Sequence, residues 1–315
     1  MKIISFAAAI AVVAALASLP WWGGDVLVQF GISALLLAVL AQSWNILGGY
    51  TGYASFGQST FYGLGAYGVA IAMVQWHLPF AAGMAFGAVV AVAAALALGL
   101  PVLRLRGHYF AIATLGLAQV MSAIFANLPI AGTNIGLVLP LLNNNTLFYE
   151  LSLALLAAAT ATVWWISRSR FGFGLIAIRE NEEAAAVMGV HTTLYKVLAF
   201  ALAAVFAALA GGIHAYWITF LDPNGAFDIG LNVKMIIMAV FGGPGTVLGP
   251  VVGAFLLSAI SEVLAAKVTT IAAMFFGVVI VLAVVLMPRG LADLRHRLRR
   301  LGLGYFADNI RRNRL

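Results

Sequence analysis

The sequence predicts an all-α polytopic membrane protein with about ten transmembrane helices, and three observations lead to this prediction. Of the 315 residues, 63% are hydrophobic and only 9% are charged, whereas soluble chains carry about 25% charged residues. Apolar runs recur along the chain, most of them near the roughly 20 residues that a helix needs to cross a bilayer. The basic residues gather in a few of the segments between these runs, as membrane topology requires.

Ten apolar segments are candidate spans, and they define a transmembrane domain over residues 1–288. They cover residues 3–19, 25–47, 56–76, 79–103, 109–130, 147–167, 197–220, 231–242, 249–266 and 270–287. The first could instead be a cleaved signal peptide, although we expect it to be retained. The third is rich in Gly, Ser and Tyr and the eighth is short. Either could be a broken or re-entrant helix, which needs protein or water around it.

The basic residues predict the orientation of these spans. With ten spans, one side of the membrane receives 15 of the 17 Lys and Arg residues, in the N-terminus, the loops at 104–106 and 168–196, and the tail at 289–315. Positive residues mark the cytoplasmic side, so both termini are expected there. The basic tail fits a topological anchor or, alternatively, an interfacial helix on anionic lipid. Because the charge follows topology, the net charge of +7 does not indicate nucleic-acid binding.

Several kinds of chemistry are missing from the sequence. It has no cysteine, no GxxxxGK[ST] phosphate-binding loop and no HExxH zinc motif, and its five histidines are scattered. We therefore expect no catalytic residue, metal site or cofactor in this chain. The span interiors also hold almost no ionisable residues, the deepest being Glu262. If the protein moves a solute uphill, the energy must therefore come from another subunit.

The stretch "ENEEAAAVMG" at 180–189 places three carboxylates in the largest predicted loop, residues 168–196. Asn181 is a suitable N-cap, and Glu182 and Glu183 would lie in the first turn, where carboxylates favour the helix dipole. The alanines that follow are strong helix formers, and Gly189 is a natural stop. The stretch predicts a short helix outside the membrane, with a small face that fits a partner's groove. A plain connecting helix is the alternative.

Within this stretch, Glu183-Ala184-Ala185-x-x-x-Gly189 resembles the EAA loop of ABC importer permeases, although the Leu-Pro of the broader pattern is absent after Gly189. Longer segments resemble the branched-chain amino acid permeases, of the LivM type more than the LivH type. These segments are residues 45–67, 104–116, 171–213, 240–254 and 287–291. The resemblance covers most of residues 30–291.

The resemblance implies a non-enzymatic subunit of an importer in the bacterial inner membrane. A second, LivH-type permease would complete the translocation path, and two cytoplasmic ATPase subunits would bind the ATP. A periplasmic binding protein would deliver branched-chain or other hydrophobic amino acids. In such permeases the EAA loop forms a coupling helix that docks in a groove of the ATPase. The ATPase-coupling residues would then be Arg179, Glu180, Asn181, Glu182, Glu183, Ala184, Ala185 and Gly189.

Uncharged polar residues inside the spans are candidates for the translocation path. They are Gln42, Asn45, Ser55, Gln58, Ser59, Thr114 and Gln119, together with Ser43, Thr60 and Ser122. For each one the alternative is a hydrogen bond between helices. The glycines at 57, 63, 65 and 68 are expected to permit close helix packing rather than to contact substrate. Thr133 and Asn134, on the predicted outer side, are candidate contacts for the binding protein.

Three other functions are weighed against this one. Relatives in the wider family carry urea and short amides, so a permease for those solutes is the nearest alternative. An ion-coupled secondary carrier using Glu262 would follow an ion gradient and need no ATPase. A membrane enzyme acting on lipids would need clustered carboxylates or histidines, and Asp25, Glu150 and Glu262 are too dispersed to supply them.

Overall fold

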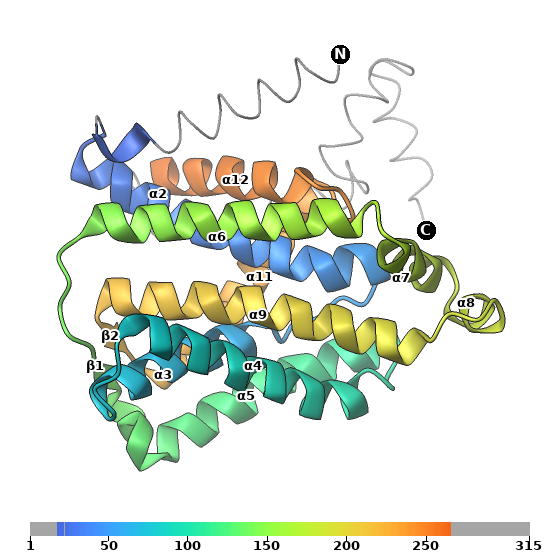
Figure 1. Ribbon diagram of the computed structural model, residues 1–315, viewed down its shortest axis with the longest axis horizontal. Coiled ribbons are helices and arrows are strands. Elements are labelled where there is room, and N and C mark those ends of the chain that lie inside the picture. The colour runs from blue at the N-terminus through green and yellow to red at the C-terminus, as the bar shows by residue number, and fades with distance from the viewer. Residues whose placement is uncertain (1–17, 22, 266–315) are drawn as a thin grey trace.

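The computed structural model describes residues 18–21 and 23–265, so the predicted span at 270–287, the tail at 289–315 and most of the span at 3–19 lie outside the described residues. Long helices run side by side along the long axis of the molecule (Figure 1). The helices are α2 (Asp25–Trp44), α3 (Gln58–Val74), α4 (Phe80–Val102), α5 (His108–Asn127), α6 (Asn145–Ile166), α7 (Arg170–Glu180), α8 (Glu182–Val187), α9 (Thr192–Ile218), α10 (Pro223–Ala226), α11 (Ile229–Gly242) and α12 (Gly249–Ala265). The shorter elements are a π-helix, η1 (Asn45–Gly49), two 3₁₀ turns, η2 (Pro129–Ala131) and η3 (Thr133–Ile135), and two strands, β1 (Leu137–Val138) and β2 (Phe220–Leu221).

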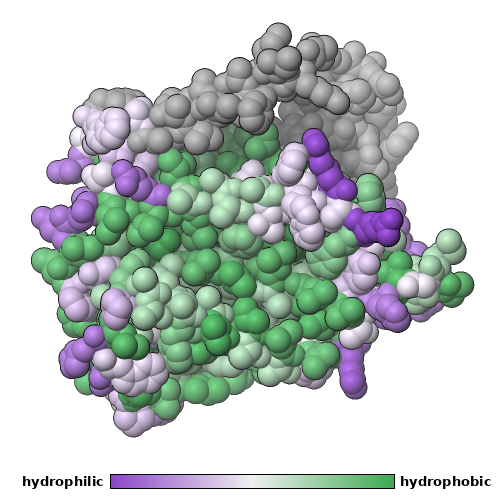
Figure 2. Space-filling view, viewed as in Figure 1, coloured by the Kyte–Doolittle hydropathy of each residue, from purple (hydrophilic) through white to green (hydrophobic). Residues whose placement is uncertain are grey.

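The described residues contain six helical segments long and apolar enough to cross a membrane. They are α2 with η1, α4, α5, α6, α9, and α10 with α11. Together with the shorter α3 and α12, they coincide within a few residues with the eight spans predicted between 25 and 266. Figure 2 shows a broad apolar band between two ends where hydrophilic residues gather. The all-α polytopic architecture is therefore confirmed, while the full number of ten spans and the cytoplasmic position of both termini stay predictions.

Helix α3 lies at the centre of the bundle, with 15 of its 17 residues buried. It packs against α9 and α4 through glycines that bring backbones into contact. A Cβ atom on Gly65 would lie 2.0 Å from the Ala208 carbonyl oxygen of α9, and one on Gly68 would lie 2.4 Å from the Gly87 Cα of α4. The packing role predicted for these glycines is confirmed, because any side chain there would overlap a neighbouring backbone.

Helix α4 presents one narrow face to this core. Its buried residues recur every fourth position, at Gly83, Gly87, Ala91, Ala95 and Gly99. Small residues at this spacing let two membrane helices approach closely. The other faces of α4 and most of α5 remain exposed in this chain.

The irregular backbone lies beside the third and eighth predicted spans rather than within them. Helix α2 ends in the π-helix η1. Segment 51–57, in which residues 52–57 have no helical structure, then leads into α3. Helix α11 is followed by a second non-helical segment, residues 243–248, before α12 begins. Both segments are bordered by glycines with positive φ, Gly52 at 75° and Gly243 at 123°.

A short antiparallel sheet joins the loop after α5 to the end of α9 (Figure 1). It pairs Leu137 with Leu221 and Val138 with Phe220. It lies at the end of the molecule away from α7 and α8 (Figure 1). The sequence analysis did not predict it, because two-residue strands leave no alternating pattern to detect.

The backbone contact at Gly65 predicts a large effect from one methyl group. Gly65→Ala should lower the thermal unfolding temperature in detergent, because overpacking a tight contact costs about 1–3 kcal/mol. Gly116→Ala is the matched control, since that glycine lies in α5 with nothing within 4 Å of its Cβ position. The control should unfold at or slightly above the wild-type temperature. Equal behaviour of the two variants would contradict the packing described for α3.

Candidate functional site

The stretch at 180–189 forms the short helix that its sequence predicts. The Asn181 side chain accepts a hydrogen bond from the Ala184 N–H at 3.0 Å and so caps α8. Gly189 follows the helix with a φ of 87°, where other residues are strained. Helix α7, which was not predicted, precedes α8 and is capped in the same way by Ser169, which accepts from the Gly172 N–H at 3.1 Å.

Helix α8 protrudes from one end of the bundle (Figure 1). Its tip is apolar and open, with Val187 88% and Met188 83% exposed. The sequence analysis did not name these two residues, although "AAAVMG" places them directly before the helix-ending glycine. Ala185, by contrast, is buried against the helix bundle. The exposed part of α8 therefore consists of Glu183, Ala184 and Ala186 together with this apolar tip.

Glu182 points inward from α8 to a buried lysine. The Lys196 Nζ atom donates to the Glu182 Oε1 atom at 2.6 Å and to the Leu103 carbonyl oxygen at 3.0 Å. It also donates to the Tyr53 hydroxyl at 3.1 Å, and that hydroxyl donates to the other Glu182 oxygen. Lys196 was predicted in the loop at 168–196. That placement is wrong, because α9 begins at Thr192 and buries the lysine, which is only 4% exposed.

The protonation states follow from these contacts. Burial acts to raise the pKa of Glu182, but the hydrogen bonds from Lys196 and Tyr53 favour the carboxylate, and the pKa is lowered overall. Burial, and then the hydrogen bond to this carboxylate, raise the pKa of Tyr53. Glu182 is therefore ionised and Tyr53 neutral at physiological pH. The three side chains form an ion pair that a hydroxyl bridges, with the Lys196 side chain buried and the Glu182 side chain 16% exposed.

The next residue behaves differently. Glu183 pairs with Arg106 at 2.9 Å, but both side chains are mostly exposed, at 78% and 63%. An exposed pair is screened by water and salt and contributes little stability. Glu183 thus remains available to a partner, whereas Glu182 is committed to the interior of this chain.

Arg179 connects the same loop to both non-helical segments. Its Nη1 atom donates to the Gly49 carbonyl oxygen of η1 at 3.0 Å. Its side chain lies against Gly52, where an added Cβ would be 3.2 Å from the Arg179 Cγ atom. A Cβ on Gly245 would be 2.9 Å from the Arg179 Nη1 atom. Arg179 therefore lies where η1 meets the segment after α11.

Two of the predicted path residues hold that segment in place. The Asn45 Oδ1 atom accepts from the Gly245 N–H at 2.7 Å, and its Nδ2 atom donates to the Thr246 carbonyl oxygen at 3.0 Å. The Gln42 Nε2 atom donates to the Val247 carbonyl oxygen at 2.6 Å. Backbone groups in a membrane need such partners when they leave regular structure. Gln42 and Asn45 are fully buried and meet this need.

Four more path candidates are also buried with hydrogen bonds inside the chain. The Ser59 hydroxyl and N–H both bond to Asn232 of α11, at 2.7 and 2.8 Å. The Gln58 amide donates to Ser43 at 2.8 Å. Further bonds are Phe56 N–H to Thr114 Oγ1 at 3.0 Å and Gly57 N–H to Ser55 Oγ at 3.2 Å. Asn232 was missed by the sequence analysis, because one polar residue in a short apolar helix gives no pattern.

Gln119 is the exception among the seven path candidates. It lies exposed on α5 between exposed apolar side chains, Leu115 and Val120 among them. The remaining candidates named beside the seven are buried: Ser43, Thr60 and Ser122. Thr133 and Asn134 lie in η3, next to β1, at the end of the molecule away from α8.

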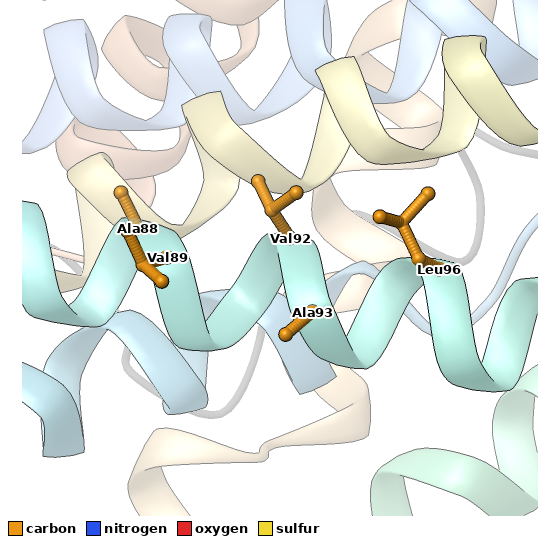
Figure 3. Close-up of a pocket in the computed structure, with 5 residues that line it drawn as sticks. All are labelled: Ala88, Val89, Val92, Ala93 and Leu96. Atoms are coloured by element: carbon orange, nitrogen blue, oxygen red, sulfur yellow. The ribbon is translucent and has the colours of Figure 1, made fainter.

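A shallow recess runs along the outer face of α4 (Figure 3). It is lined by Ala88, Val89, Val92, Ala93 and Leu96, all from this one helix. Its lining offers no polar group to orient an amino acid, so it fits an apolar lipid chain better than a polar solute.

Within the described part of the chain, no three His, Asp or Glu side chains are placed to hold a metal ion.

These features define a polytopic α-helical membrane protein, with internally paired polar groups and a loop that protrudes from one end of the bundle. The family described as "Branched-chain amino acid transport system / permease component" matches residues 26–284, and the chain belongs to this family. It is therefore an ABC-type permease subunit and not an enzyme.

Two curated relatives are similar over most of the chain. They are the high-affinity branched-chain amino acid transport system permease proteins LivM of Salmonella typhimurium and Escherichia coli, each 26% identical over 85% of this chain and 70% of the relative. The autoinducer 2 import system permease protein LsrC of Yersinia pestis is 37% identical over 33% of this chain and 31% of its own length. No solved structure matches.

The contrast between Asn45 and Gln119 predicts different outcomes for the same type of substitution. Asn45→Leu should lower the thermal unfolding temperature in detergent, because it strips the Gly245 N–H and Thr246 carbonyl of their partner. Each buried polar group left unpaired costs about 1–3 kcal/mol. Gln119→Leu should leave the unfolding temperature unchanged, because no hydrogen bond within the described chain is lost. A stable Asn45→Leu variant would show that segment 243–247 is held by other contacts.

Proposed function

We propose that this chain is one of two different permease subunits in an ATP-driven importer. The observation that carries the proposal is α8, a capped helix that protrudes from the bundle with Val187 and Met188 open to solvent. An isolated connector would gain nothing from exposing these side chains. A partner groove would bury them, and burying apolar side chains favours association.

The distribution of charge supports a cytoplasmic position for α8. Six of the seven Lys and Arg residues among the described residues lie in or beside the elements at this end: Arg104, Arg106, Arg168, Arg170, Arg179 and Lys196. Positive residues are enriched in cytoplasmic loops. We infer that α7 and α8 face the cytoplasm of a bacterial cell and that the helices span its inner membrane.

The partners follow from this orientation. Two cytoplasmic ATPase subunits would bind ATP and receive α8, with contacts to Glu180, Glu183, Ala184 and the apolar tip. A periplasmic binding protein would meet the opposite end, where Thr133 and Asn134 lie beside β1. A second permease, of the LivH type, would share the translocation path, and membrane lipid would cover the remaining apolar surface.

A path shared by two subunits must run along a surface of each one. Helix α5 fits this requirement, because it is the least buried of the six membrane-capable segments and carries Gln119 exposed among apolar residues. A polar side chain facing lipid is costly, so such residues normally face protein or a water-filled cavity. We propose that the exposed face of α5 lines the path.

The proposed substrates are branched-chain and other hydrophobic amino acids. The LivM relatives, named for this transport, cover most of the chain, whereas the LsrC relative covers a third of it. A path face with an uncharged polar residue suits a solute without net charge. Urea and short amides share that property and are the alternative.

Two measurements test the whole proposal. A tag on the C-terminus should bring down a second permease and two ATPases from gently solubilised membranes. The reconstituted complex with its binding protein should then import leucine, rather than urea or short amides, in proportion to ATP hydrolysed. Transport by the chain alone that follows an ion gradient would instead support a secondary carrier, with Glu262, which lies exposed on α12, as the first residue to test.

The exposed tip of α8 predicts a local effect on assembly. Met188→Glu should reduce co-purified ATPase about tenfold or more, because a charged group buried without a partner opposes docking. Leu141→Glu is the matched control, since Leu141 is 82% exposed at the opposite end of the molecule. It should retain the wild-type amount of ATPase. Normal ATPase recovery with Met188→Glu would remove α8 as the docking element.

A further inference from the structure

The α7–α8 loop is attached to the membrane helices by apolar packing, such as the Phe171 ring against Tyr195 of α9, and by three polar contacts that differ in kind. Glu183 pairs with Arg106 in solvent, and Arg179 reaches the Gly49 carbonyl. Glu182 alone enters a buried cluster, where Lys196 and Tyr53 contact both of its oxygens. Lys196 also bonds the Leu103 carbonyl after α4. This one cluster therefore joins α8, α9, the end of α4 and segment 51–57.

Segment 51–57 leads from this cluster toward the interior of the bundle. The Trp44 indole N–H of α2 donates to the Ser55 carbonyl oxygen at 2.9 Å. The Phe56 N–H donates to Thr114 of α5 at 3.0 Å, and a Cβ on Gly57 would lie 2.7 Å from the Thr114 carbonyl oxygen. Two residues further on, Ser59 is bonded to Asn232 of α11. A displacement of Tyr53 therefore acts on backbone that contacts α5 and α11 directly.

We propose that Glu182, Lys196 and Tyr53 form a joint that transmits displacement of α8 to segment 51–57, and through it to α5 and α11. They are positioning residues, since none of them faces the exposed tip of α8 or the exposed face of α5. The inference rests on the proposed function, because it takes α8 as the element that the ATPase moves.

The physical basis is the difference between a buried and an exposed ion pair. Lys196 is enclosed and donates three hydrogen bonds to three different acceptors, so its ammonium has no free donor and little freedom to move. Separating it from Glu182 would leave a charge uncompensated in a poorly solvated site. The Glu183–Arg106 pair can separate into water at little cost. A displacement of α8 is therefore transmitted to the bundle through the Glu182–Lys196 pair. The Glu183–Arg106 pair separates instead and transmits little.

The enclosed and the exposed ion pair supply the experiment and its control. Glu182→Gln and Tyr53→Phe would be compared with Arg106→Gln, which breaks only the exposed pair with Glu183, in the complete transporter, purified with its ATPases and reconstituted with its binding protein. The measured quantity is the amount of leucine transported per ATP hydrolysed, which does not depend on how much protein folds. ATPase recovery in the purified complex is recorded in parallel.

We expect Glu182→Gln to lower transport per ATP about tenfold, within the usual range for loss of coupling between two sites, with ATPase still bound. Tyr53→Phe should lower it less, because the ion pair remains, and Arg106→Gln should match wild type, because it breaks only the exposed pair. The exchanged pair Glu182→Lys with Lys196→Glu should recover part of the loss.

Two results would overturn the inference, and they are distinguishable. If ATPases bind and all three single variants keep the wild-type ratio, the joint fails while the proposed function stands. If the wild-type chain recovers no ATPase, the proposed function fails and the inference fails with it. Should Glu182→Gln not fold, Tyr53→Phe, which keeps every charge in place, decides by the same ratio.

Discussion

The close approach of α3, α4 and α9 is the constraint on which the remaining structure depends. Inside a bilayer, lipid tails are as apolar as leucine, so helices associate through close packing and polar contacts. Gly65, Gly68 and Gly87 supply that packing by placing backbone against backbone. With α3 fixed at the centre, segment 51–57, which leads into it, is held in place by the bonds from Trp44 to Ser55 and from Phe56 to Thr114.

The polar groups of the bundle serve this irregular backbone. Helices satisfy their own N–H and C=O groups in a membrane, whereas residues 52–57 and 243–248 depend on others. Gln42 and Trp44 at the end of α2 and Asn45 at the start of η1 provide several of the missing partners, and Arg179 donates to the Gly49 carbonyl at the end of η1. Most of the polar residues that the sequence offered as a transport path are thus used within the chain. Gln119, which lacks such a role in the described chain, is the one that faces outward.

Hydropathy predicted eight described spans within a few residues, and local capping predicted α8, because both signals lie in contiguous sequence. The features that the sequence did not predict also have physical causes. Helix α9 begins five residues before its apolar run, since "TTLYK" is polar and its lysine is neutralised only by Glu182, a partner from another element. The π-helix η1 and the pairing of β1 with β2 depend on contacts between segments about 80 to 200 residues apart, which no local pattern reports.

Glu182 and Glu183 show why the functional reading needs the three-dimensional structure. They are identical neighbours in the first turn of α8, and capping and helix-dipole arguments treat them alike. A helix turns by about 100° per residue, so one side chain faces the bundle while the next faces solvent. Glu182, on the inner side, contacts Lys196 and Tyr53, and Glu183, on the outer side, pairs with Arg106 in solvent. A short helix can then present one face to a partner and anchor the other in its own protein. An element proposed to carry motion between two proteins needs both faces, because a helix held by solvent-exposed contacts alone would move without moving the bundle.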